Sequence, residues 1–162
     1  MSTWPQWLPL REELAPMSAY GAPQVEADAS LNTNENPFSP SPELVKAIAA
    51  RVTEIGSRLN RYPDREATEL RTSLAHYINS QSGTSVDISN VWAANGSNEI
   101  IQSIFLAFGR KSALGFTPSY SMHPLIAKVT ATPWIDGTRR KDFTLDCDAA
   151  AVQIESLRPT LT

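Results

Sequence analysis

The chain has 162 residues, of which 41% are hydrophobic and 19% charged, and its net charge at neutral pH is −3. This length suits one domain with a sizeable core, and the slight negative charge excludes the basic footprint of a nucleic-acid or anionic-membrane binder. Cys147 is the only cysteine, which excludes a disulfide framework and a thiolate metal cluster. His76 and His123 lack metal-ligand spacing, so we expect no metal site.

Residues 1–41 are predicted to form an N-terminal arm and not a domain of their own. They are rich in proline and polar residues, and their apolar residues follow no clean period. Such a segment needs a larger body or a partner subunit to lie against. The arm does not resemble a signal peptide, and no run in the chain is long enough to cross a bilayer, so we expect a cytoplasmic protein.

Residues 42–90 are predicted to form a helical segment. Ser41 followed by Pro42 is typical of a helix start, and the first helix is expected to span residues 42–55 and to end at Gly56. Asp64 is expected to cap a second helix spanning roughly residues 65–79. The first helix should bury an apolar stripe. This stripe comprises Leu44, Ile48, Val52 and Ile55.

Residues 91–109 are predicted to form a short buried strand, a tight turn and a helix. The apolar run 91–94 suits a covered strand, and Asn95-Gly96 is a strong turn dipeptide. Ser97 or Asn98 could cap the helix that follows. A helix start behind such a turn is a natural anion site, because its N–H groups point at the ligand. The alternative is a plain strand–turn–helix joint without a ligand.

The remaining residues repeat this alternation of strands and helices. Residues 113–116 and 132–135 are expected to be strands, with a helix over about residues 120–130 between them and a turn at Asp136-Gly137. Asp146 or Asp148 should cap a last helix, and no strand is expected after Pro159. Strands that alternate with helices predict an α/β fold with a parallel sheet.

Several motifs resemble those of one enzyme family, in its order and spacing. They occupy residues 20–23, 32–37, 59–64, 93–99 and 115–124. Together they resemble the motifs of histidinol-phosphate aminotransferases, and their amino-acid sequences are similar to those of the actinobacterial branch of that family. The resemblance runs from about residue 8 to residue 157, and the ordered set is far more specific than any single motif.

The resemblance implies a fold-type-I enzyme that depends on pyridoxal 5'-phosphate (PLP). Such enzymes are homodimers with helices on both faces of a large-domain sheet, and residues 91–162 would begin this PLP-binding domain. The implied reaction exchanges an amino group between L-histidinol phosphate and 2-oxoglutarate, a step of histidine biosynthesis. A relative with the same fold, such as an aromatic aminotransferase or a threonine-phosphate decarboxylase, is the alternative.

The resemblance also assigns roles to particular residues. Gly96, Ser97 and Asn98 would hold the PLP phosphate, and Tyr120 would stack on the pyridine ring. Tyr62 would cross the dimer interface to the neighbour's PLP. Three arm residues would line the substrate entrance. These are Tyr20, Glu35 and Asn36.

Three positions depart from the family pattern. Asn98 stands where many members have Asp, and Ser119 where Thr is usual; both can still form hydrogen bonds. His123 replaces a frequent tyrosine, which puts any substrate contact there in question.

No catalytic residue is predicted, because the Schiff-base lysine of the family has no counterpart here. None of the four lysines lies in a Ser-Lys-x-Phe-Gly setting. The chain therefore resembles the first part of the enzyme, with an incomplete sheet. We expect strands 91–94 and 113–116 to lack partners, Ile100, Ile104 and Phe105 to be exposed, and the chain to be poorly stable and inactive alone. A non-catalytic dimerisation or binding module is the further alternative.

Overall fold

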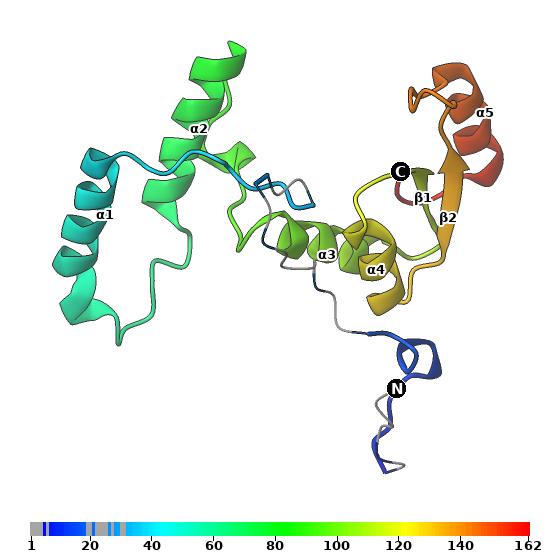
Figure 1. Cartoon of the computed structure of the whole chain (residues 1–162), viewed down its shortest axis with the longest axis horizontal. Helices are drawn as coiled ribbons and strands as arrows, with labels where there is room; N and C mark the ends of the chain where they lie inside the picture. Colours follow the sequence, from blue (N-terminus) through cyan, green and yellow to red (C-terminus); the bar gives the residue numbers. More distant parts are fainter. Residues whose placement is uncertain (1–4, 6, 19–20, 22–25, 27, 30–31) are drawn as a thin grey trace. The chain divides into compact units, whose positions relative to one another are not determined.

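The structure is a computed structural model that describes residues 5, 7–18, 21, 26, 28–29 and 32–162. The chain divides into two compact units, one formed by Ala19–Ala93 and the other by Met1–Ser18 with Ala94–Thr162. Figure 1 shows the helices and strands of both units, coloured along the chain. The domain boundaries inferred from the sequence, after residues 41 and 90, stay predictions. No helix within the described ranges combines the length and apolarity that a bilayer span requires.

Helix α1, Pro42–Ile55, has the bounds that the sequence predicts. The Ser41 hydroxyl oxygen accepts the N–H of Leu44 at 3.2 Å, and Pro42 occupies the first helical position. The predicted buried stripe is wrong, because Leu44, Ile48 and Val52 are each more than half exposed. The described residues of this unit leave that face uncovered, and an apolar stripe is buried only where another element packs on it. Gly56 has helical angles and starts the 3-10 turn η2, Gly56–Arg58, instead of stopping the helix in a left-handed conformation.

Helix α2, Thr68–Ser82, begins three residues later than predicted. The Asp64 carboxylate accepts the N–H groups of Thr68 at 2.7 Å and Glu66 at 3.1 Å, so it caps the turn before the helix. These hydrogen bonds hold the pKa of Asp64 below its ordinary value, and the one from Thr68 has the larger effect. Ala67 takes a left-handed conformation with φ 47°, which delays the helix to Thr68.

Arg71 of α2 fixes the segment that leaves this unit. Its guanidinium donates to the carbonyl oxygens of Val91 at 2.6 Å, Ile88 at 2.7 Å and Glu66 at 3.0 Å. Ile88 lies in the 3-10 turn η3, Ile88–Asn90, which Asp87 caps. These charge-assisted hydrogen bonds give three backbone carbonyl oxygens a donor. Pairing with a neighbouring strand is therefore not needed to satisfy them. The predicted strand 91–94 is wrong: residues 91–94 pair with no strand in the described chain.

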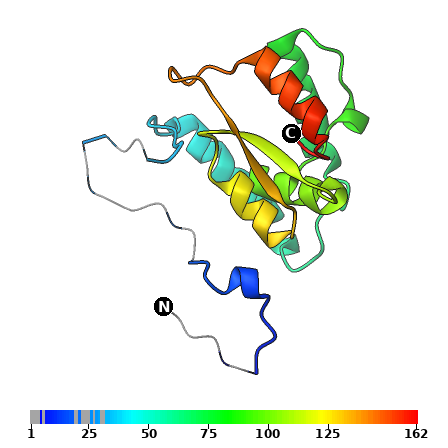
Figure 2. The same cartoon turned by 90° about the vertical axis from the view of Figure 1, so that its right-hand side faces the viewer.

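The second unit contains a two-stranded parallel sheet (Figures 1 and 2). Strand β1, Ala113–Thr117, pairs with β2, Trp134–Thr138, in the register Ala113↔Trp134 to Thr117↔Thr138, and α4, Met122–Val129, connects them. The strand predicted at 132–135 therefore lies two residues later, and α4 begins two residues after the predicted Tyr120. The turn predicted at Asp136-Gly137 is wrong, since both residues belong to β2.

The expectation that residues 113–116 lack partners is also wrong. The N–H of Ala113 donates to Pro133 O at 2.8 Å, and the N–H of Leu114 donates to Leu161 O at 3.0 Å. Leu161 forms a parallel bridge with Ala113, so pairing resumes after Pro159, where no strand was expected. Successive N–H groups point to opposite sides of a strand, and β1 therefore lies between β2 and Leu161.

Helix α3, Ser97–Phe108, covers the sheet through Phe105, which is 8% exposed and packs with Ala113, Ile126 and Ala127. Its predicted exposure is wrong, whereas Ile104 is 37% exposed, as expected. The 3-10 turn η1, Glu12–Leu14, contacts α4, and Arg11 donates to the carbonyl of Val129.

Helix α5, Cys147–Leu157, starts at the predicted cap. The Asp146 carboxylate accepts the N–H of Ala149 at 3.0 Å and pairs with Arg140 at 2.9 Å. Both contacts keep the pKa of Asp146 below its ordinary value, and the hydrogen bond from the Ala149 N–H has the larger effect. Ala150 is the buried residue of the helix, while the apolar side chain of Val152 is 67% exposed.

We expect Gly109→Ala to destabilise the chain by about 1–3 kcal/mol, because added bulk in a packed site forces neighbours to move. A Cβ at Gly109 would lie 2.2 Å from Thr132 Oγ1 and 2.4 Å from the carbonyl oxygen of Phe105. Gly56→Ala is the control: its Cβ meets nothing within 4 Å and its angles are helical. The control should be neutral or up to about 1 kcal/mol more stable. Urea unfolding midpoints measure both changes, and equal midpoints for the two variants would contradict the packing argument.

We expect Asp146→Asn to remove a pH-dependent part of the stability. The folded-state pKa of Asp146 is lowered, so its contribution is present above the ordinary carboxyl pKa and is lost as pH falls through the folded value. Asparagine keeps the helix cap without titrating. Wild type should therefore unfold at higher urea than the variant at pH 7, and the two should converge as pH falls below the lowered folded-state pKa of Asp146. A difference that stays constant across this range would count against the Arg140 pair.

Candidate functional site at the start of helix α3

Gly96 caps α3 with backbone angles of φ 81° and ψ 171°. Only glycine populates this region readily, because a Cβ would clash with its own backbone. No side-chain hydrogen bond caps the helix, so the predicted cap at Ser97 or Asn98 is wrong. Both residues lie instead in the first turn of the helix, where peptide N–H groups have no partner within the helix. A Cβ built at Gly96 meets nothing within 4 Å, so the space beside this turn is open.

Glu99 stabilises this turn through a hydrogen bond between residues of the turn itself. The N–H of Asn95 donates to Glu99 Oε2 at 2.6 Å, which ties the residue before the cap to the third residue of the helix. This bond satisfies one peptide donor and places a carboxylate in the positive first turn. It links residues 95 and 99 within the turn. The remaining N–H groups of the turn are the ones that a bound anion would meet.

Ser97 and Asn98 differ in their surroundings. Ser97 is exposed, so its hydroxyl is accessible as a donor. Asn98 is half-buried, and its side-chain Oδ1 is buried without a hydrogen-bond partner among the residues described. A buried amide oxygen without a donor costs about 1–3 kcal/mol. Such an atom is expected where a further group completes the hydrogen bonding.

Tyr120 lies in the same unit, in the turn before α4, and is 47% exposed. Its ring contacts the imidazole of His123, with ring centroids 5.5 Å apart and planes at 88°. This contact was not predicted from the sequence, although the spacing of three residues next to a helix start could have indicated it. Within the described chain, no hydrogen bond or ring contact joins Tyr120 to the start of α3.

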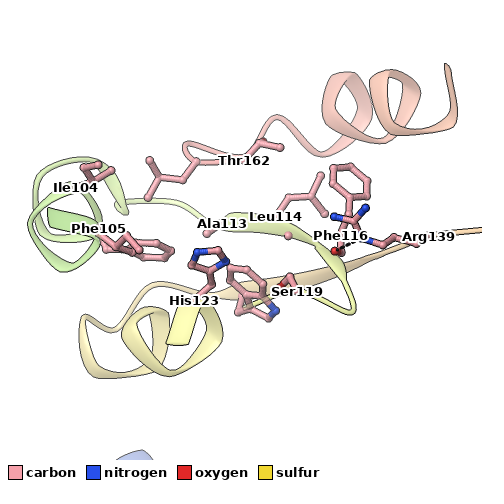
Figure 3. A pocket seen from close by; sticks show the side chains of 13 residues that line it. Ile104, Phe105, Ala113, Leu114, Phe116, Ser119, His123, Arg139 and Thr162 are labelled. Atoms are coloured by element: carbon pink, nitrogen blue, oxygen red, sulfur yellow. Dashed lines mark hydrogen bonds between the residues drawn. The ribbon is translucent and has the colours of Figure 1, made fainter. Parts of the chain in front are cut away.

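A pocket of about 300 Å³ opens beside β1 (Figure 3). Phe105, Ala113 and Leu114 supply apolar lining, and His123 and Ser119 supply polar atoms. At one end Arg139 Nε donates to Phe116 O at 3.0 Å, drawn as a dashed line in Figure 3. The pocket is therefore mainly apolar, with polar groups contributed by Ser119 before α4, by His123 within α4 and by Arg139.

The other predicted site residues belong to the unit formed by residues 19–93, whose placement against this one is not described. Tyr62 is fully exposed at the end of an extended connection, as expected for a residue before proline. Glu35 is exposed, and Asn36 Oδ1 accepts the N–H of Phe38 at 3.0 Å in a local turn. Tyr20 lies outside the described residues.

The lysines lie where the sequence places them. Lys46 is in α1 and Lys128 in α4, while Lys111 and Lys141 are exposed in connections. The part of the chain that the structure describes contains no cluster of three or more His, Cys, Asp or Glu side chains suited to a metal ion.

We expect Gly96→Ala to destabilise the chain by about 2 kcal/mol through backbone strain alone. Gly83→Ala is the matched control, since Gly83 also has a positive φ of 62° and open space around its Cβ. The angles of Gly83, however, lie in the left-handed helical region, where alanine costs only about 1 kcal/mol. Chemical denaturation of both variants measures the difference, and an equal or larger loss for Gly83→Ala would contradict the strain assigned to Gly96.

Comparisons with known proteins agree on one family. The model of "Aminotransferase class I and II" matches residues 28–160. The chain is 55% identical over 156 residues to the histidinol-phosphate aminotransferase of Thermobifida fusca (strain YX), covering 95% of this chain and 41% of that protein. It is 54% identical over 154 residues to that of Rhodococcus opacus (strain B4), covering 94% and 40%. The chain thus spans about two fifths of the length of these curated relatives.

A solved structure shares the fold. It is a crystal structure from Burkholderia pseudomallei K96243, provisionally described as an aminotransferase, with a TM-score of 0.58 and 24% identity over 74% of this chain and 34% of that one. The described elements, an α/β arrangement with an open two-stranded sheet, are consistent with that fold. The family match, which covers most of the residues, shows that this chain belongs to the class I and II aminotransferases.

Proposed function

We propose that this chain supplies the phosphate-binding part of a PLP-dependent histidinol-phosphate transaminase. The reaction transfers an amino group between L-histidinol phosphate and 2-oxoglutarate in histidine biosynthesis. The observation that carries this proposal is the identity of 55% across 95% of the chain with a protein named for that activity. Because the chain spans only about two fifths of that relative, the activity is proposed for the whole enzyme and not for these 162 residues alone.

The start of α3 fits the phosphate group of PLP on two grounds. Gly96 leaves open space next to the helix N-terminus, and the peptide N–H groups there favour an anion. The exposed Ser97 hydroxyl can donate to a phosphate oxygen. The unpartnered Asn98 Oδ1 is an acceptor and does not itself favour a phosphate; the Nδ2 amide group of this residue is the part that could donate to one. The Glu99 carboxylate opposes anion binding, but its bond to Asn95 directs one oxygen at a peptide N–H.

PLP, when bound, acts as an electron sink for the carbanion formed at the substrate's α-carbon. The residues of this chain would bind and orient it. Gly96, Ser97 and Asn98 would hold the phosphate, and the half-exposed ring of Tyr120 would restrain the tilt of the pyridine ring. None of the four lysines has the setting expected for the reactive lysine, which the whole enzyme would supply from outside these residues.

The remaining assignments concern a second subunit and the substrate. Tyr62 is fully exposed, which suits a phenol that reaches the PLP phosphate of a partner in a homodimer. Glu35 and Asn36, with Tyr20, would line the substrate entrance. The enzyme would act in the cytoplasm, without nucleic-acid or membrane partners, as the slight negative charge of the chain favours.

A chimera tests the proposal. This chain replaces the matching segment of the Thermobifida fusca enzyme, and transamination between histidinol phosphate and 2-oxoglutarate is measured against PLP concentration. We expect an active chimera in which Ser97→Ala raises the PLP concentration for half-saturation roughly tenfold, through loss of a charge-assisted hydrogen bond. Ser103→Ala is the control on the same helix, because its hydroxyl donates to the Glu99 carbonyl at 2.9 Å and not towards the turn.

Three results would contradict the proposal. A PLP-loaded chimera that uses phenylalanine but not histidinol phosphate would assign the segment to an aromatic aminotransferase. If the Ser97→Ala and Ser103→Ala chimeras needed the same PLP concentration for half-saturation, the phosphate site would not lie at the start of α3. Turnover by the 162-residue chain alone would show that one of its own lysines serves the reaction.

A further inference from the structure

The contact between Tyr120 and His123 fixes the plane of an otherwise exposed ring. The rings are nearly perpendicular, which brings the positive edge of one aromatic system against the negative face of the other. The N–H of His123 donates to Tyr120 O at 3.1 Å, and Ser121 between them has helical angles. The backbone turn therefore sets the distance between the two rings, and the ring contact sets the orientation of Tyr120.

His123 is held more firmly than Tyr120. It is the second residue of α4, it is half-buried, and its side chain lines the pocket beside β1 (Figure 3). Tyr120, in contrast, is 47% exposed, and His123 is its only aromatic neighbour in the described chain. A half-exposed aromatic ring without such a contact would populate several rotamers and would have to be ordered when a ligand binds.

We propose that His123 is a positioning residue that holds the Tyr120 ring in the plane on which the cofactor's pyridine ring stacks. The proposal rests on the proposed function, because it needs Tyr120 to meet that ring. It also accounts for the departure of His123 from the frequent tyrosine of the family. The role requires an aromatic ring that can form this perpendicular contact and not a phenol hydroxyl, and imidazole supplies such a ring.

The test compares two ligands on the full 162-residue chain. One is 4-deoxypyridoxine 5-phosphate, which has the pyridine ring and the phosphate but no aldehyde to react with surface lysines. The other is inorganic phosphate, which has no ring. We expect His123→Leu, which keeps bulk without an aromatic edge, to raise the dissociation constant of the ring ligand about three- to tenfold. Phosphate affinity should stay unchanged, and His123→Phe should restore binding of the ring ligand.

Two variants serve as controls. His76→Leu changes the other histidine, which is exposed on α2, and should alter neither affinity. Tyr120→Leu should weaken the ring ligand at least as much as His123→Leu. In NMR spectra of the free chain, Tyr120→Leu should also shift the ring-proton resonances of His123, and this readout needs no ligand.

The outcomes separate this inference from the proposed function. Unchanged His123 resonances in Tyr120→Leu, unchanged ring-ligand affinity in His123→Leu, or equal weakening of both ligands would overturn the positioning role. A Tyr120→Leu chain with normal ring-ligand affinity would overturn the stacking assigned to Tyr120. A wild-type chain that binds neither ligand would overturn the phosphate site at α3, and with it this inference.

Discussion

Strand β1 is the element on which the folded part of residues 94–162 depends, because it is hydrogen-bonded along both edges. Ala113 donates to Pro133 O on one side and Leu114 to Leu161 O on the other. A parallel strand between two neighbours must be covered on its faces, and Phe105 of α3 and Ile126 of α4 provide that cover in the core around Ala113. The turns at Gly96 and at Tyr120 both lead into helices that are held by this core.

The register of the sheet explains residues that otherwise look misplaced. A Cβ at Gly115 would lie 2.2 Å from the Trp134 ring, and one at Gly137 would lie 2.6 Å from the Phe116 ring. In each case a glycine on one strand makes room for an aromatic ring on the other. Gly137 is therefore a strand residue selected by packing, although next to Asp136 it has the local signature of a turn.

Signals contained within a few residues were predictable from the sequence, and signals that need a distant partner were not. Ser41 and Asp146 cap their helices as expected, since a cap is a bond between residues three apart. Residues 91–94 look like a strand but pair with no strand in the described part of the chain, and no described element covers the apolar stripe of α1. At the site, the glycine at position 96 was predictable from its turn, and the spacing of three residues between Tyr120 and His123 could have indicated their contact, although this spacing does not set the angle between the rings.

The difference between local contacts and contacts with distant residues also applies to the candidate site. Glu99 holds the turn at Gly96 through Asn95, four residues away, and His123 contacts Tyr120 from three residues away. Contacts between residues so close in sequence close only short loops, so their entropic cost is small and they form without the rest of an enzyme. Covering the exposed stripe of α1 requires surface from elsewhere. The turn at Gly96 and the ring contact of Tyr120 therefore depend on local contacts, whereas burial of the α1 stripe does not.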